Sequence, residues 1–596
     1  MKSFPKIAAL SLAGTLGFGL ASCKKADRLD AEVPSTEQEN LGFSLPAQDQ
    51  QMLSKLLAET WDCLDAMIDP DTGLPQDTQN PGGHTNTTNL GLYLASLCVA
   101  HETGLVTAEH AHARADKLLS SIEGFDRMHG FMPHIIQVKL TGNKAQGYMA
   151  VSDFNKLAVG LIMLRQTVPS LEPRITAFLD AIEWGRLYDE KSGKLSWGYD
   201  FDQDKKLGAG PLWLTADTRC AAFMMVATDA APPEIWERME RIPLETKFGT
   251  ILRGYGMGGL FLHAMDGLFL PEIDTEVGES AGNMAWQQMK LAQKRGYPLW
   301  GWSNCYMPGS GYTQGGHLPE YVVTPHVMSL MIEYYPQKVT SALRYMIENG
   351  GTVAPKEFAG KNWGLRDAYD LRTQQWDAHY LSLDQGMLFL AISNFLHDGV
   401  VRKIYASDPL VQNGLKKLEP FIKKKPELLE LWAERDATEL VPVPQVSAVE
   451  KMTALELSPC SNNVTQKTQG ASFTLNFDNK GKEALLHAKF SCDPVNITGF
   501  KSLVFEMEAP AEPRVGHLRV FLKDKFNQER YAHIEIKPGV HSYEIPADDL
   551  HGILIDEESV TELTFLAWNN PWYYSDKKFT AGAVELELSN VRVIAR

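Results

Sequence analysis

The chain has 596 residues, of which 44% are hydrophobic and 22% charged, and its formal net charge is −17. This length predicts more than one folding unit, and the acidic balance argues against a nucleic acid as partner. The seven cysteines include no Cys-x-x-Cys pair, so we expect neither a metal site nor a cofactor.

Residues 1–22 have the pattern of a secretory signal. Two lysines precede an uncharged apolar run, residues 7–20, that is too short to span a bilayer stably. The run ends in Leu-Ala-Ser-Cys at residues 20–23, which resembles the lipobox at which bacterial lipoprotein signals are cleaved and the cysteine is acylated. The alternative is an ordinary signal peptide with a cysteine near its cleavage point.

We therefore expect a lipid on Cys23 to tether the mature protein to a membrane. Residues 23–45 are mostly polar, which predicts a flexible tether. No later segment has the uncharged apolar length of a transmembrane helix, so the lipid is the expected anchor. This places the protein in the periplasm or on the cell surface of a bacterium, with the outer membrane favoured.

Residues 46–437 have the periodicity of an all-α domain. Leu157, Leu161 and Leu164 recur at helical spacing, as do apolar residues between 339 and 346. Thr107 is placed to cap one helix and Pro336 to begin another. The loops between helices show no succession of strands that would indicate a parallel sheet.

After residue 437 the pattern changes. A proline-containing stretch, residues 438–449, predicts a stiff linker. Residues 450–596 then show short runs of alternating apolar and polar residues, such as 473–477 and 503–507, which predict a β-sandwich. Four aromatic residues there either hold glycan or pack the sandwich against the helical domain: Trp568, Trp572, Tyr573 and Tyr574.

Five segments of the helical domain, taken in order, resemble the glycoamylase-like family, which includes endo-β-1,2-glucanases and related domains of cyclic β-1,2-glucan synthases. They are residues 69–77 (DPDTGLPQD), 87–94 (TTNLGLYL), 152–158 (SDFNKLA), 380–386 (YLSLDQG) and 407–411 (SDPLV). The resemblance implies an (α/α)6 barrel over residues 46–437 with its active site in a cleft at one end. It also implies a glycoside hydrolase that acts on a glucan. The family expectations are a β-1,2 linkage in the substrate and inversion at the anomeric carbon. We expect the protein to be a monomer.

Such hydrolysis needs one carboxylic acid to protonate the leaving oxygen and a second carboxylate to activate water. The candidates are Asp217, Asp384 and Asp153, each on a loop or at a helix start. Asp217 falls where the family commonly has an Asn-Glu pair. Its side chain is one methylene shorter than Glu, so it would reach the leaving oxygen either directly or through a bridging water. For Asp153 and Asp384 the alternative role is to cap a helix.

Asp367 lies in a segment, residues 363–370, that is similar to a family loop which orients the sugar or a catalytic group. Its structural alternative is an ion pair with Arg366 or Arg372. Asp370 stands where the family usually has Asn.

Aromatic side chains offer flat apolar surfaces to sugar rings. The residues that we expect to bind substrate share a loop setting or a place in the family-like segments: Trp300, Trp302, Asn304, Tyr306, Tyr312, Trp363, Trp376, Asp367, Gln385, Arg219 and Asn89. Asn304 and Cys305 stand near a position where the family often has an acid. The alternative for these aromatic residues is packing at the loop ends of a helical barrel.

Two other functions stay open. A barrel that binds glycan without cleaving it would explain the departures from the family at Asp217, Asn304 and Asp370. A polysaccharide lyase of similar architecture would use a histidine or tyrosine as its base, and the histidines of this chain are scattered.

We predict that Cys23→Ser releases the protein from membranes, because lipid at this residue is the expected anchor. Fractionation of cells that express the parent and the variant would measure it. Retention of the variant in the membrane pellet would contradict the lipid assignment.

Overall fold

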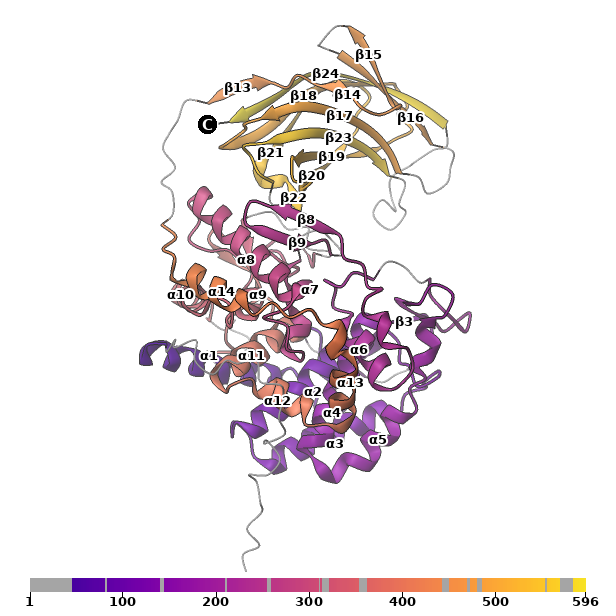
Figure 1. Cartoon of the computed structure of the whole chain (residues 1–596), viewed down its shortest axis with the longest axis vertical. Helices are drawn as coiled ribbons and strands as arrows, with labels where there is room; N and C mark the ends of the chain where they lie inside the picture. The colour runs from indigo at the N-terminus through magenta and orange to yellow at the C-terminus, as the bar shows by residue number, and fades with distance from the viewer. Residues whose placement is uncertain are drawn as a thin grey trace, which may run out of the picture.

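The computed structural model shows a mainly helical region, from residue 45 to 441, and a β region, from residue 450 to 595 (Figure 1). The predicted signal peptide, Cys23, nearly all of the predicted tether and most of the predicted linker lie outside the described residues. The structure describes residues 45–80, 83–139, 144–208, 212–254, 259–309, 311–313, 321–352, 362–441, 450–468, 472–479, 485–552, 555–568 and 582–595.

Helices α1 to α14 build the first region. Three of them, α2, α4 and α11, are apolar on nearly every side and lie in its interior, as expected for helices without a polar face. None of the described helices is both long and apolar enough to cross a bilayer. The bounds are α1 Ala47–Ala66, α2 Thr87–Glu102, α3 Ala108–Glu123, α4 Val151–Thr167, α5 Glu172–Asp180, α6 Arg219–Ala227, α7 Leu260–Ala264, α8 Glu276–Arg295, α9 Pro325–Leu330, α10 Pro336–Glu348, α11 Ser382–Leu396, α12 Val400–Ala406, α13 Pro409–Leu418 and α14 Glu427–Ala437.

Short strands lie in the loops between these helices, where the sequence predicted none. Each has only two to four residues, which is too few to show a period of two. They pair in small antiparallel sheets that fix the loops. The bounds are β1 His84–Asn86, β2 Ile135–Gln137, β3 Tyr148–Ala150, β4 Tyr188–Asp189, β5 Lys194–Leu195, β6 Gly198–Asp200, β7 Lys205–Lys206, β8 Pro243–Thr246, β9 Gly249–Leu252, β10 Val322–Val323, β11 Tyr369–Asp370 and β12 Gln375–Trp376.

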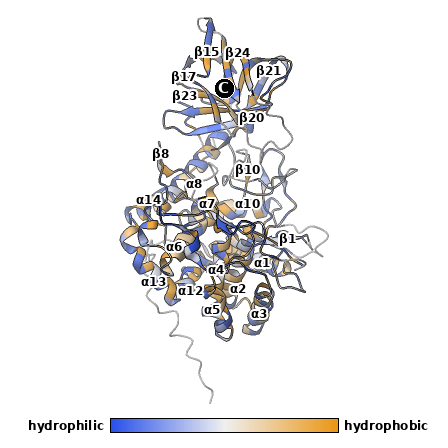
Figure 2. Cartoon of the chain, turned by 90° about the vertical axis from the view of Figure 1, so that its right-hand side faces the viewer, coloured by the Kyte–Doolittle hydropathy of each residue, from blue (hydrophilic) through white to orange (hydrophobic). Residues whose placement is uncertain are grey.

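Glycine allows α2 and α4 to touch along their backbones. A Cβ atom at Gly91 would lie 2.0 Å from the carbonyl oxygen of Lys156, and one at Gly160 would lie 2.4 Å from the carbonyl oxygen of Gly91. No other residue fits at this distance. Hydrophobic residues are abundant around these two helices (Figure 2), and the contact fixes α4, whose first turn carries Asp153.

The helix ends confirm some predictions and correct others. Thr107 accepts a hydrogen bond from the backbone N–H of His110, and Pro336 begins α10. The capping alternative is wrong for Asp153 and for Asp384, because α4 and α11 begin after Ala150 and Leu381, and neither carboxylate accepts a capping hydrogen bond. Both aspartates lie instead in the first turn of their helix.

The β region consists of two six-stranded antiparallel sheets. One has the order β15-β16-β24-β18-β21, with β13 also paired to β24, and the other has the order β14-β17-β23-β19-β20-β22. The alternating runs of the sequence are strands, as predicted. The bounds are β13 Lys451–Ala454, β14 Ser458–Pro459, β15 Val464–Thr468, β16 Ser472–Asn479, β17 Leu485–Val495, β18 Phe500–Ala509, β19 His517–Asp524, β20 Glu529–Glu535, β21 Gly539–Pro546, β22 His551–Gly552, β23 Val560–Trp568 and β24 Gly582–Ala595.

The two sheets pack face to face as a sandwich. The rings of Phe473 and Phe490, from opposite sheets, are 4.8 Å apart, and those of Phe505 and Phe565 are 5.3 Å apart. Alternate residues of each strand supply this core. Of the aromatic residues predicted as a glycan platform, residues 572–574 lie outside the described residues, as does the side chain of Trp568.

A buried acid joins the two regions. Glu557 of the β region is 4% exposed and pairs with Lys294 at 2.8 Å and Arg295 at 2.5 Å, at the end of α8. Burial raises the pKa of Glu557, but the charges of Arg295 and Lys294 outweigh it and leave the pKa lowered. Lys247, in the turn between β8 and β9, forms a further pair with Asp556 at 3.0 Å. Figure 1 shows β8 and β9 at the side of the helical region that faces the β region.

We predict that Gly91→Ala destabilises the protein by about 1–3 kcal/mol, the usual cost of overpacking, because the added methyl group meets a main-chain oxygen. Urea unfolding would measure the difference. Gly208→Ala is the control, since a Cβ at Gly208 meets nothing within 4 Å. Equal stability of the two variants would contradict the close contact.

Candidate active site

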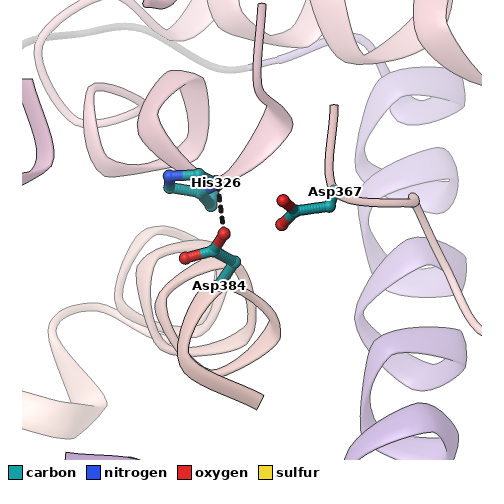
Figure 3. Close-up of side chains that lie close together, drawn as sticks. All are labelled: His326, Asp367 and Asp384. Carbon is teal, nitrogen blue, oxygen red and sulfur yellow. Dashed lines mark ion pairs between the residues drawn. The ribbon is translucent and has the colours of Figure 1, made fainter. Parts of the chain in front are cut away.

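Three buried side chains from different parts of the helical region converge (Figure 3). His326 comes from α9, Asp384 from the first turn of α11, and Asp367 from the loop before β11. Their ligand atoms lie within 4.8 Å of one another, and the three residues are only 1–2% exposed. His326 Nδ1 lies 3.4 Å from Asp384 Oδ2.

Burial dominates the protonation of this cluster. It raises the pKa of Asp384 well above its usual range, and the negative charge of Asp367 raises it further. Burial also raises the pKa of Asp367, while the backbone N–H of Tyr306, which donates to Asp367 at 2.5 Å, opposes the rise. Burial lowers the pKa of His326 to about 3, so the imidazole is neutral. Asp367 and Asp384, here called the carboxyl pair, therefore hold one proton between them at neutral pH.

Several polar atoms of the cluster lack a hydrogen-bond partner in the described part of the chain. They are both oxygens of Asp384, Oδ1 of Asp367 and both ring nitrogens of His326. Buried polar atoms in this state are costly and mark a place for chemistry or for a small ligand such as water. One imidazole and two carboxylates are also a donor set that a divalent cation accepts, so the expectation of no metal stays a prediction.

Asp217 lies in the loop that ends at α6 and is half-buried. Its backbone carbonyl accepts a hydrogen bond from Lys156 Nζ at 2.7 Å, and Lys156 in turn pairs with Asp266 at 2.7 Å, with both side chains fully buried. Burial raises the pKa of Asp217 to about 6, the charge of Lys156 opposes the rise, and the charges of Asp266 and Asp153 add to it. Asp217 thus keeps its proton in mildly acidic solution.

Asp153 is a carboxylate under the same conditions. It accepts a hydrogen bond from the Thr88 hydroxyl at 2.8 Å, and His134 Nδ1 lies 3.3 Å from it. Burial raises the pKa of Asp153, but His134, Thr88 and Ser152 together leave it lowered. Asp153 and Asp217 therefore differ in charge although they lie close enough to influence each other, which is the usual arrangement of acid and base groups at one site.

Tyr306 and Tyr312, both predicted to bind substrate, lie beside the carboxyl pair. The two tyrosines form a β-bridge, and the ring of Tyr306 stacks on His379 at 4.2 Å. Burial raises the pKa of Tyr312, and the charges of Asp384 and Asp367 add to the rise. Asp367 makes its hydrogen bond with Tyr306 rather than with Arg366, whose guanidinium donates to the Gly350 carbonyl.

The two tryptophans of the neighbouring loop are buried. Trp300 is 6% exposed and lines a separate hollow of about 460 Å³ between α8, α10 and the end of the helical region. Trp302 exchanges backbone hydrogen bonds with the Gln288 side chain. Asn304 is also buried, and its Oδ1 has no partner among the described residues.

Arg219 and Asn89 bind neighbouring protein groups beside the site. The fully buried guanidinium of Arg219 pairs with Glu272 at 2.7 Å and donates to the carbonyl of Ala216 at 2.8 Å, so its donors face protein groups and hold the loop before Asp217. Asn89 donates to Asp77 at 2.9 Å. The structure thus places both in the framework rather than where a ligand reaches them.

The other predicted residues lie around α11 and β12. Gln385 donates to the Leu365 carbonyl at 2.8 Å. Trp363 packs edge-on against Tyr380 at 5.8 Å, and Trp376 packs on Tyr369 at 4.8 Å. Each of these contacts is with protein, so packing accounts for their positions.

The sequence did not single out several residues of the site. His326 and His134 have no local motif, because their partners Asp384 and Asp153 lie elsewhere in the chain. Asp77 ends the family-like segment 69–77 but was given no role, although it accepts a hydrogen bond from Asn89. Lys156 lies inside the family-like segment 152–158. A lysine in an otherwise apolar helix indicates that its charge pairs with a buried acid, and the structure shows that this acid is Asp266.

Comparison with protein families gives two matches in the helical region. The family model described as "Putative glucoamylase" matches residues 223–409. The resemblance to the glycoamylase-like family is confirmed. A second model, for a family of unknown function, matches residues 57–199, which contain Asp153. A comparison with curated proteins finds no match.

Two solved glucanase structures share the fold of the helical region. An endo-β-1,2-glucanase from Chitinophaga pinensis, solved with sophorotriose and glucose, is 19% identical with a TM-score of 0.52, covering 63% of this chain and 98% of the other. A β-1,2-glucanase from Parabacteroides distasonis is 19% identical with a TM-score of 0.53, covering 63% of this chain and 60% of the other.

We predict that Asp217→Asn stabilises the protein at pH 7.5 but not at pH 4. The folded pKa of Asp217 is about 6 against a usual 3.8, so the stability that this carboxyl contributes is complete below about pH 4 and is lost as the pH rises through about 6. A shift of this size corresponds to at most about 3 kcal/mol, which partial exposure reduces to roughly 1 kcal/mol.

Urea unfolding of parent and variant between pH 4 and 7.5 would measure this. The exposed Asp126 provides the control Asp126→Asn, which should follow the parent at every pH. A variant no more stable than the parent at pH 7.5 would show that Asp217 ionises without cost.

Proposed function

We propose that the helical region is an (α/α)6 barrel that hydrolyses a glucan, with β-1,2 linkage as the expected substrate. The observation that carries the proposal is the set of carboxyl groups with opposite protonation: Asp217 and Asp384 retain protons, while Asp153 is ionised. Glycoside hydrolysis requires such a division of acid and base. The fold shared with β-1,2-glucanases supports the choice of substrate.

In this mechanism Asp217 protonates the leaving oxygen. As the C–O bond breaks, its electron pair stays on that oxygen, and the oxygen of a water molecule bonds to the anomeric carbon with inversion. The carboxyl pair still carries one negative charge and receives the proton of that water. Because Asp384 is 2% exposed, water rather than the glycan is the group that reaches the pair. The charge of Asp153 stabilises the positive sugar ring of the transition state.

The chain is further proposed to act outside the cytoplasm, held to a membrane by lipid on Cys23. A glucan chain is too large to cross a membrane passively, so a membrane-tethered hydrolase would shorten it outside the cytoplasm. The role of the β-sandwich as a glycan-binding domain belongs to the same proposal.

The deciding experiment incubates the soluble mature protein, without residues 1–23, with a panel of glucans that differ in linkage, followed by chromatography of the products. Cleavage of β-1,2-glucan is expected. Binding without cleavage at any pH would favour the glycan-binding alternative, and unsaturated products would identify a lyase.

We predict that kcat/KM falls as the pH rises above about 6. An acid catalyst must be protonated to act, and the pKa of Asp217 is about 6, so each further pH unit removes about tenfold of the active form. Initial rates between pH 4 and 9 would measure the profile. A rate that keeps rising to pH 8 would exclude Asp217 as the acid.

We predict that Asp384→Asn lowers turnover by about 10²- to 10⁴-fold, the usual contribution of a proton-transfer group, and leaves the fold intact. Asparagine keeps the shape of the side chain but cannot exchange a proton. Asp370→Asn is the matched control, because Asp370 is also a buried aspartate, and an asparagine there keeps the oxygen that accepts the backbone N–H groups of Arg372 and Thr373.

Turnover and circular dichroism of both variants would be compared. Near-normal turnover of a folded Asp384→Asn protein would mean that the carboxyl pair is not part of the reaction, and Asp153 would be tested next.

A further inference from the structure

Three rings form a continuous aromatic surface at one edge of the helical region. Tyr148 is 42% exposed and Trp197 is 44% exposed, and their rings are 6.2 Å apart. The ring of His134 stacks on Tyr148 at 5.2 Å with an interplanar angle of 18°. These three residues, here called the aromatic shelf, were not predicted from the sequence.

The backbone holds the shelf rigidly. Strand β3 pairs with β6, and the N–H of Val151 donates to the carbonyl of Trp197 at 3.0 Å. A Cβ atom at Gly198 would lie 2.2 Å from the carbonyl oxygen of Met149, so glycine is what permits the two strands to approach. The N–H of His134 donates to the carbonyl of Tyr148 at 2.8 Å. The backbone that carries the three rings is therefore ordered before any ligand arrives, which lowers the entropic cost of binding.

The shelf is connected to the candidate acid. His134 Nδ1 lies 3.3 Å from Asp153. On the same turn of α4, the side-chain amide of Asn155 donates to the backbone carbonyls of Ser152 at 2.9 Å and Asp217 at 3.3 Å, and the charge of Asp153 acts on both Tyr148 and Asp217. A single exposed aromatic side chain is ordinary on a protein surface. Two exposed rings that continue through a histidine to the ionised Asp153, beside the candidate acid Asp217, are arranged as a ligand site is, with apolar faces beside a few polar groups.

We propose that the aromatic shelf binds a sugar ring of the substrate next to the bond that Asp217 protonates. The flat C–H face of a pyranose ring matches an aromatic surface, and its hydroxyl groups match His134 and the Tyr148 hydroxyl. The ligand is an uncharged glycan, because the ionised Asp153 repels an acidic sugar. This inference rests on the proposed function and names the part of the substrate that the site recognises.

The test compares Trp197→Ala and Trp197→Phe with the parent on β-1,2-linked gluco-oligosaccharides. Loss of the ring should raise KM roughly 3- to 10-fold, the range expected for one aromatic contact, with kcat much less affected, and phenylalanine should restore most of the loss. Leu105→Ala, an exposed apolar residue elsewhere on the helical region, is the control and should behave as the parent. Circular dichroism would verify that every variant is folded.

A second measurement separates this inference from the proposed function. Calorimetric titration of the oligosaccharides into Asp384→Asn, with and without Trp197→Ala, reports binding in the absence of turnover. Weaker binding on loss of Trp197, even if the parent cleaves nothing, supports the shelf while the hydrolase proposal fails. Unchanged binding and unchanged KM for Trp197→Ala overturn the shelf while the hydrolase proposal stands.

Discussion

The buried ion pair of Lys156 and Asp266 is the interaction on which the candidate site depends. An ammonium group with no exposure to water is stable only with an ionic partner and further acceptors, and here it has Asp266, the Asn155 side chain and the backbone carbonyl of Asp217. The lysine therefore links the interior of α4 to the loop that carries the acid. Gly91 of α2 packs against the backbone of Lys156 in the same turn of α4. The packing of α2 on α4 therefore also helps to set the position of Asp217.

The buried acids of the candidate site lower the free energy of unfolding at neutral pH. Asp217, Asp367 and Asp384 all have raised pKa values because burial disfavours their charged forms, and each raised value lowers stability at neutral pH. The extensive apolar core of the helical region offsets this cost. Proteins commonly retain such local destabilisation where catalysis requires a proton to be held ready.

The sequence predicted the elements with a clear period or a clear end, such as the helix after Thr107 and the strands around Phe473 and Phe505. Short strands in loops were missed because two to four residues show no period. The family-like segments contain Asp153 and Asp384, and comparison with the family's Asn-Glu pair pointed to Asp217. They did not identify the histidine partners, since which histidine meets which carboxylate depends on tertiary packing. For the same reason Arg219 and Trp300 were predicted to bind substrate, although Arg219 is buried against Glu272 and the buried Trp300 lines a separate hollow.

The charges of the site also bear on the choice between hydrolase and lyase. A lyase removes a proton beside the carboxylate of an acidic sugar and needs a cation to neutralise that carboxylate. Here the cation next to Asp217, Lys156, is fully engaged with Asp266, and the ionised Asp153 faces the same space. His326 is neutral and lies in the interior with its Nδ1 against Asp384, and His134 pairs with the ionised Asp153. An uncharged sugar with a poor leaving group suits these groups better, because it needs a proton donor and a negative charge rather than a positive one.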